Sequence, residues 1–232
     1  MDATGFKNGV VISNVDEVLI EDVEVANANE HGILLLNCGT AVVRRTESHH
    51  NGQNGGSQGS GLFASNWQNL LIEGSEFSDN SEHYGLYLLG GDAPNTAVRE
   101  VVADRNVAGV SVRAIDADVD RVTARNNTSY GVATSNRIQD PPTRSLRPHI
   151  HDCVLEGNET AQVSLGNVND PLVEGNSLVC SDAGQAGVRV YQSDGAVISG
   201  NTITGPEGFT VVNEDTGAEN VTFEDSNTVI ET

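Results

Sequence analysis

The sequence repeats one short unit from near its start to near its end. In seven of the nine units a glycine opens an apolar stretch, a polar turn follows, and a second apolar stretch leads into a turn that is rich in asparagine. The intervals between openings run from 22 residues (Gly109 to Gly131) to 31 residues (Gly131 to Gln162). Because one such unit cannot bury its own apolar face, the units must stack, which predicts a solenoid. The openings fall at Gly9, Gly32, Gly61, Gly85, Gly109, Gly131, Gln162, Gly187 and Phe209.

Apolar side chains within the openings alternate with the two-residue period of a β-strand. Ile33 and Leu35 share one face of their strand, as do Val188 and Val190 further along the chain. The second apolar stretch is rich in β-branched residues, and no segment shows the 3.6-residue period of an amphipathic helix. The sequence therefore predicts an all-β fold, a right-handed parallel β-helix of about nine coils, as one domain over residues 1–232.

Asparagines recur at a similar offset after the second apolar stretch. Stacking would align them in an internal ladder, in which each side-chain amide bonds to the turns above and below. The positions expected to build this ladder are Asn80, Asn106, Asn126, Asn158, Asn176 and Asn201.

These repeats resemble the right-handed parallel β-helix (pectate-lyase-like) superfamily, which includes pectate lyases, polygalacturonases, mannuronan C5-epimerases and viral tailspikes. The resemblance spans Gly9 to about Ile230 and implies the fold, because such repeats carry architecture rather than a reaction. The catalytic signatures of the enzymes are missing. The epimerase motif Tyr-Gly-x-Asp-Pro-His is incomplete at Tyr84 and at Tyr130, and the polygalacturonase motifs are absent.

The charge of the chain limits its partners. The sequence has 33 acidic and 12 basic residues, a formal net charge of −21, and Lys7 as its only lysine. Phosphate recognition needs clustered positive charge, so nucleic acid and anionic membrane surfaces are excluded as partners. A lysine-poor acidic chain is typical of proteins from salt-rich cells, because high salt screens the repulsion between carboxylates. We therefore expect a halophilic archaeal source.

The sequence shows no signal peptide and no apolar run that could insert into a membrane. The resemblance implies an extracellular or cell-surface location. Solenoids need polar caps, and neither Met1 nor the segment after Phe209 begins one, so we expect a longer protein, an oligomer or neighbouring domains at these ends. Cys38, Cys153 and Cys180 share no position in the repeat and are expected to be buried free thiols.

Outward positions of the first strand in each unit form a column that suits a polysaccharide. Coils lie about 4.8 Å apart, so one sugar residue would span one to two coils. Aromatic rings can stack on sugars, and guanidinium groups bind carboxylates. Two long loops, over residues 49–60 and 135–148, are expected to wall the column. Alternatively, its apolar members simply lie under those loops. The predicted substrate-binding residues are Phe63, Tyr87, Ser111, Arg137, Arg189 and Tyr191.

Three residues near this column are the candidate catalytic groups. His83 precedes the strand of Tyr87 and is placed to act as a general base, while Arg113 is expected to neutralise a uronate carboxylate. Asp92 and Asp116 each follow a strand glycine by seven residues in neighbouring coils. Stacked carboxylates about 5 Å apart can hold Ca²⁺ or share a proton, which makes Asp116 a catalytic and metal candidate and Asp92 a metal candidate. Turn formation is the alternative role of both aspartates.

Two classes of function stay open from the sequence. The column of rings and cations favours a carbohydrate-directed protein, a polysaccharide lyase or epimerase acting on an extracellular polysaccharide. The missing signatures favour a non-catalytic structural or adhesive solenoid, such as a surface protein or a segment of a viral fibre or tailspike.

The charge argument leads to a first prediction. The melting temperature of the protein should rise between about 0.1 M and about 2 M KCl, because salt relieves the repulsion among its carboxylates. Thermal unfolding followed by circular dichroism measures the change. Equal melting temperatures at the two salt concentrations would contradict a halophilic origin.

Overall fold

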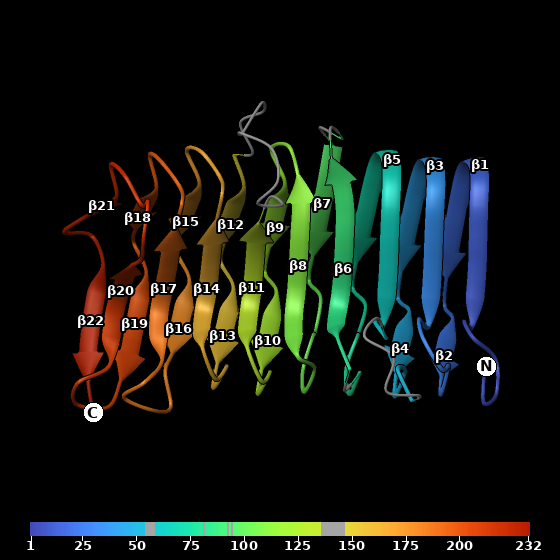
Figure 1. Cartoon of the computed structure of the whole chain (residues 1–232), viewed down its shortest axis with the longest axis horizontal. Helices are drawn as coiled ribbons and strands as arrows, with labels where there is room; N and C mark the ends of the chain where they lie inside the picture. The colour runs from blue at the N-terminus through green and yellow to red at the C-terminus, as the bar shows by residue number, and fades with distance from the viewer. Residues whose placement is uncertain (54–58, 81, 92, 94, 136–146) are drawn as a thin grey trace.

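The computed structural model of the chain describes residues 1–53, 59–80, 82–91, 93, 95–135 and 147–232. These residues form a stack of parallel β-coils, and no helix occurs among them. Figure 1 shows the coils side by side along the long axis of the molecule, with the N-terminus at one end and the C-terminus at the other. No described segment is a helix that could cross a membrane.

Each coil begins with a strand on the same face of the solenoid. Eight successive parallel pairings join these first strands in chain order. The predicted stack of about nine coils is thereby confirmed. The first strands are β1 (Val10–Glu21), β3 (Ile33–Arg44), β5 (Leu62–Glu73), β6 (Tyr84–Gly91), β8 (Ala108–Ala114), β11 (Tyr130–Ser135), β14 (Ala161–Gly166), β17 (Ala186–Tyr191) and β20 (Thr210–Glu214).

Two further faces complete each coil. The first three long strands, β1, β3 and β5, continue around the first corner, and so the first and second faces form one 15-stranded sheet. The remaining second-face strands are β7 (Asn95–Arg99), β9 (Asp118–Asp120), β12 (His149–His151), β15 (Leu172–Glu174), β18 (Val197–Ser199) and β21 (Thr222–Phe223). The third-face strands are β2 (Glu24–Ala26), β4 (Glu47–His49), β10 (Thr123–Arg125), β13 (Val154–Glu156), β16 (Ser177–Val179), β19 (Thr202–Gly205) and β22 (Thr228–Glu231).

The core is a narrow column of aliphatic side chains that runs along the stack. Ile33, Val188 and Val190 are fully buried and Leu35 is nearly so, as the alternation in the sequence predicts. Each coil adds one layer to this column, and the layers exclude water only because the next coil covers them. The three cysteines are buried free thiols, also as predicted.

Buried amides line two corners of the solenoid. At the corner that leads into the first face, each asparagine Nδ2 donates to the Oδ1 of the next, from Asn51 through Asn80, Asn106 and Asn127 to Asn158. At the corner between the second and third faces, Asn176, Asn201 and Asn227 form a separate ladder of the same kind. The single ladder expected from the sequence is therefore two ladders.

The prediction of Asn126 as a ladder member is wrong, because Asn127 takes that place. Asn126 has a φ of 53° and is exposed. The residue before every other ladder asparagine of this corner also has positive φ, for example Arg105 at 55° before Asn106 and Gly157 at 63° before Asn158. This left-handed residue turns the chain and directs the side chain that follows it inward.

Both end coils expose apolar side chains. In the first coil Val11 is 56% exposed and Leu19 is 58% exposed, and in the last coil Phe223, Val229 and Ile230 are each more than 40% exposed. In the next coil the residues paired with Val11 and Leu19, which are Leu34 and Val42, are half-buried.

Removing one ladder amide should destabilise the whole stack. Asn106 Oδ1 accepts the backbone N–H of Asn80 at 2.9 Å, and its Nδ2 donates to the Phe77 carbonyl at 2.9 Å. In Asn106→Ala both groups stay buried without a partner, so the free energy of unfolding should fall by about 2–4 kcal/mol. Urea denaturation measures this. The control Asn126→Gly keeps the positive φ and should change stability little, and an equal loss in both variants would contradict the ladder argument.

Candidate functional site

The outer side of the first face carries the column of residues expected from the sequence. The backbone register aligns Leu34 with Phe63, Phe63 with Tyr87, and Tyr87 with Ser111. Further along the stack Ser164 aligns with Arg189. Stacking therefore brings together side chains that lie more than twenty residues apart in the sequence.

Aromatic rings form a continuous run from His31, just before β3, across β5 to β6. The ring of His31 stacks on Phe63, with centroids 5.0 Å apart, and Phe63 lies 5.3 Å from Tyr87. Tyr87 in turn stacks on Tyr84 at 4.7 Å, and His83 packs edge-on against both tyrosines. Rings at these separations attract one another, so the run forms a packed aromatic surface.

All four tyrosines of the chain gather on this face. Burial raises the pKa of the Tyr84 phenol. The phenols of Tyr87, Tyr130 and Tyr191 add to this rise of the Tyr84 pKa, and the Arg113 cation opposes it. We name this surface the aromatic face; it consists of Phe63, His83, Tyr84, Tyr87, Arg113, Tyr130, Arg189 and Tyr191.

Arg113 has no carboxylate partner among the described residues. Its guanidinium carbon lies 5.4 Å from the centroid of the Tyr87 ring, in a cation–π arrangement. Its Nε–H group is buried and bonds to none of the described residues. Every other described arginine forms an ion pair, so the cation of Arg113 stands out in this acidic chain.

Arg189 belongs to the same face but already has partners. One guanidinium nitrogen donates to the Tyr130 hydroxyl at 2.9 Å and another to Asp215 at 2.8 Å. The group also lies 5.2 Å from the ring centroid of Tyr191. Arg189 therefore fixes the positions of two tyrosines, and its charge is largely balanced by Asp215.

The two histidines of the aromatic run are neutral at physiological pH. Burial lowers the pKa of His31 to about 4 and that of His83 to about 4, and the Arg113 cation adds to the effect at His83. The His83 Nδ1 lies 3.3 Å from the Ser60 hydroxyl, while the His31 Nδ1 accepts the Ser60 backbone N–H at 3.2 Å. An uncharged imidazole beside a guanidinium group can accept a proton from a bound ligand.

The other predicted site residues lie elsewhere or are covered. Ser111 is only 2% exposed, so it offers little surface to a ligand. Asp116 forms a two-point ion pair with Arg147, both contacts being 2.8 Å, which occupies both carboxylate oxygens. Asp92 and Arg137 lie outside the described residues, as do the central parts of both expected loops.

Sequence reasoning missed Tyr84 and Tyr130. Each directly precedes a strand glycine, where strict alternation would place its side chain with the inward residues Leu86 and Val132. The structure leaves both half-buried on the outside instead, because the chain enters the strand from a corner. The repeated Tyr-Gly pair at the same point of two units was the available signal.

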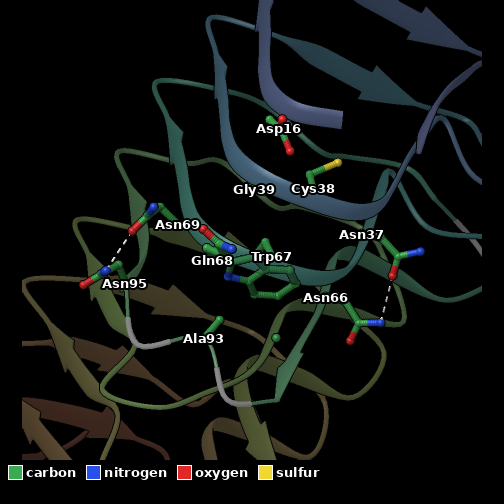
Figure 2. Close-up of a pocket in the computed structure, with 11 residues that line it drawn as sticks. Asp16, Asn37, Cys38, Gly39, Asn66, Trp67, Gln68, Asn69, Ala93 and Asn95 are labelled. Atoms are coloured by element: carbon green, nitrogen blue, oxygen red, sulfur yellow. Dashed lines mark hydrogen bonds between the residues drawn. The ribbon is translucent and has the colours of Figure 1, made fainter. Parts of the chain in front are cut away.

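A polar groove beside the aromatic face was also not predicted from the sequence. It has a volume of about 800 Å³ and lies where β3 and β5 bend around the first corner. Figure 2 shows its amide side chains, with Asn66 donating to Asn37 and Asn95 donating to Asn69. Trp67 forms its floor and is 7% exposed. Strands β5 and β6 contribute to both the groove and the aromatic face.

The neutral histidines predict a loss of stability in acid. Between about pH 6.5, where a histidine of the unfolded chain titrates, and about pH 4, the unfolded chain binds protons that the folded chain does not. Stability therefore falls as the pH falls through this window, by up to about 1.4 kcal/mol per pH unit for the buried His31 and by less for the more exposed His83.

Urea denaturation at a series of pH values tests this. The variant His31→Gln should show a shallower loss of stability over the window than the parent protein, whereas the exposed control His50→Asn should keep the parent slope. Identical slopes in all three proteins would show that His31 is not buried in its neutral form.

Known proteins were compared with this chain by sequence and by structure. A sequence comparison with curated proteins gave no match. Among solved structures, the surface protein and adhesin PfbA of Streptococcus pneumoniae is similar, with a TM-score of 0.60 and 13% identity over 95% of this chain and 68% of that one. A mutant of the periplasmic alginate epimerase AlgG gives a TM-score of 0.54 and 12% identity over 96% of this chain and 77% of that one.

Identities this low show the fold and no activity. The family of the right-handed beta helix region matches residues 8–138, which is more than half of the chain. The match extends through the first strands that carry Phe63, Tyr84, Tyr87 and Arg113. The chain belongs to the right-handed β-helix family.

Proposed function

We propose that the protein binds an acidic polysaccharide along its aromatic face. The observation that carries this proposal is Arg113, a half-buried cation over the Tyr87 ring with a buried Nε–H that no described residue satisfies. The Nε–H itself is closed to solvent, so a ligand carboxylate would bind the other guanidinium nitrogens of this half-buried side chain, which form no ion pair with a described residue. The neighbouring rings supply flat apolar surface for sugar rings.

The charge of the protein favours an acidic ligand at this one place. A net charge of −21 repels a polyanion from most of the surface. At the aromatic face, however, no described carboxylate pairs with Arg113, and Asp215 is already paired with Arg189. A uronate carboxylate can therefore form a charge-assisted hydrogen bond with Arg113 while its sugar ring packs on Tyr87 or Tyr84.

The two structural relatives are consistent with this proposal. One is a surface protein and adhesin, and the other is a periplasmic alginate epimerase. They illustrate that this fold serves both attachment at a cell surface and chemistry on a polysaccharide. We extend the proposal to an extracellular or cell-surface location for this chain, in keeping with a partner found outside cells.

A second candidate function is catalysis on the same polysaccharide. His83 is neutral at physiological pH, and the Arg113 cation contributes to its low pKa. Its ring packs against the rings of Tyr84 and Tyr87. In a lyase or an epimerase, the imidazole would remove the proton on the carbon next to a uronate carboxylate, and Arg113 would stabilise the resulting negative charge. The raised pKa of Tyr84 keeps its hydroxyl protonated, and so able to return a proton.

Binding is tested with a charged polymer and its neutral counterpart. Affinity electrophoresis or calorimetry should detect binding of alginate or polygalacturonate and much weaker binding of the same polymer after reduction of its carboxyl groups. The variant Arg113→Gln lacks one charge-assisted hydrogen bond to the polymer and should bind it roughly 10- to 100-fold more weakly. The matched control Arg125→Gln, on the third face, should bind as the parent does. Equal binding by both variants, or equal binding of the neutral polymer, would contradict the proposal.

Catalysis is tested separately on the same polymers. A lyase creates an unsaturated product that absorbs in the ultraviolet, and an epimerase exchanges the abstracted proton with deuterated solvent, which NMR detects. Either rate should rise with pH through about 4, where His83 loses its proton, and should vanish in His83→Gln while binding persists. Binding without either signal would identify the protein as a non-catalytic adhesive solenoid.

A further inference from the structure

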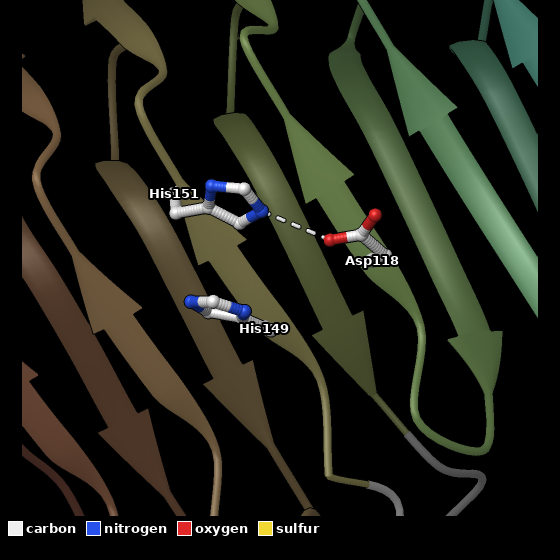
Figure 3. A group of neighbouring side chains, drawn as sticks. All are labelled: Asp118, His149 and His151. Carbon is white, nitrogen blue, oxygen red and sulfur yellow. Dashed lines mark hydrogen bonds and ion pairs between the residues drawn. The ribbon is translucent and has the colours of Figure 1, made fainter.

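We propose that Asp118, His149 and His151 bind a divalent transition-metal ion of the Zn²⁺ class on the second face of the solenoid. Figure 3 shows the three side chains on the outer surface of β9 and β12, with the His151 ring directed toward Asp118. This site is independent of the aromatic face, which lies on the first strands of the coils.

The parallel register places these residues together. Asp118 pairs with His149, and the next outward position pairs Asp120 with His151. Between them, Val119 and Ile150 are fully buried and point into the core. The side chains of Asp118, His149 and His151 therefore emerge on the same surface from two adjacent coils, although 31 residues separate Asp118 from His149 (149 − 118).

Donor atoms in this group are close enough to share one ion. One donor atom from each of the three residues lies within 4.8 Å of the others. The Nε2 of His151 is 2.9 Å from Asp118 Oδ1, and the two imidazole rings are stacked with centroids 4.2 Å apart. Arg99 binds the other oxygen of Asp118, Oδ2, at 2.7 Å, which leaves Oδ1 available to a metal. Ligation at about 2.0–2.2 Å needs only small movements of half-exposed side chains.

A second, independent observation comes from Asp120, whose side chain is only 8% exposed. Its Oδ1 atom is buried and has no hydrogen-bond partner among the described residues. That atom points to the Nδ1 of His151, at 3.6 Å, and Asp152 lies 3.0 Å from the same nitrogen. When a metal occupies Nε2, the proton of His151 resides on Nδ1, where these two carboxylates can accept it.

This arrangement is that of a metal-bound histidine supported by carboxylates. Metal-ligating histidines usually donate their second ring N–H to a carboxylate, which fixes the ring orientation and strengthens the ligand. His149 has a carboxylate neighbour too, Glu174 on β15, at 2.8 Å from Nε2. An ion here would therefore tie β9 and β12 together directly and would extend the connection to β15.

The donor set selects the kind of metal. Two imidazole nitrogens and one carboxylate oxygen suit Zn²⁺, Co²⁺ or Ni²⁺, whereas Ca²⁺ and Mg²⁺ prefer oxygen ligands only. The role that follows from its position is structural, because the ion would hold adjacent coils in register beside the longest interval of the repeat. Binding to the folded state alone would raise the stability of the protein in proportion to the logarithm of metal concentration.

The test uses chelator-treated protein without an affinity tag. Calorimetry should give one Zn²⁺ per chain, and Zn²⁺ should raise the melting temperature while Ca²⁺ should not. His149→Gln, His151→Gln and the isosteric Asp118→Asn should each lower Zn²⁺ affinity at least about ten-fold. Circular dichroism verifies that each variant is folded. If a histidine variant does not fold, the Zn²⁺ affinity of Asp118→Asn decides the result.

The matched control is His49→Gln. His49 lies with Glu24 and Glu47 in another group that could hold an ion, on the third face, so this variant detects binding there. Affinity should be unchanged in His49→Gln. Loss of Zn²⁺ binding in this control with retention in Asp118→Asn would overturn the proposal, as would a parent protein that binds no stoichiometric Zn²⁺ or binds Ca²⁺ equally well.

Discussion

Hydrogen bonding between successive coils is the constraint on which the rest of this structure depends. A coil has no internal partner for most of its backbone N–H and C=O groups, so each must pair with the coil before and the coil after it. In-register parallel pairing then sets every side chain about 4.8 Å from its equivalents in neighbouring coils. A residue at one position therefore belongs to a column of side chains that runs along the stack.

Local periodicity explains why much of this fold can be predicted from the sequence. A two-residue alternation determines that Leu35 points inward and Phe63 outward, whatever the rest of the chain does. The corners are different, because a single left-handed residue decides which of Asn126 and Asn127 enters the core. The cluster at His151 could not be predicted either, since the register across the 31-residue interval emerges only when the coils stack.

The acidic composition places a second demand on the stack. Stacking places carboxylates of successive coils near one another, where they repel. An arginine in one coil reduces this repulsion by pairing with a carboxylate of the preceding coil. Arg105 bonds to Asp79 in this way, Arg121 to Glu100, and Arg44 to Glu21. Each exposed pair contributes little by itself. Together these pairs occupy most of the few cations that the chain has, so few positive charges remain unpaired on its surface.

Arg113 is the exception among the described arginines. Arg113 could be tied by a carboxylate at an equivalent position of a neighbouring coil, yet the register sets Leu89 there on one side. The guanidinium group lies over Tyr87 instead, with a buried N–H left without a partner among the described residues. Such a group lowers the stability of the unliganded protein and gains most from a ligand that brings its own negative charge. The same physical reasoning applies to the buried Asp120 oxygen beside His151, whose gain would come when a metal directs the imidazole proton toward it.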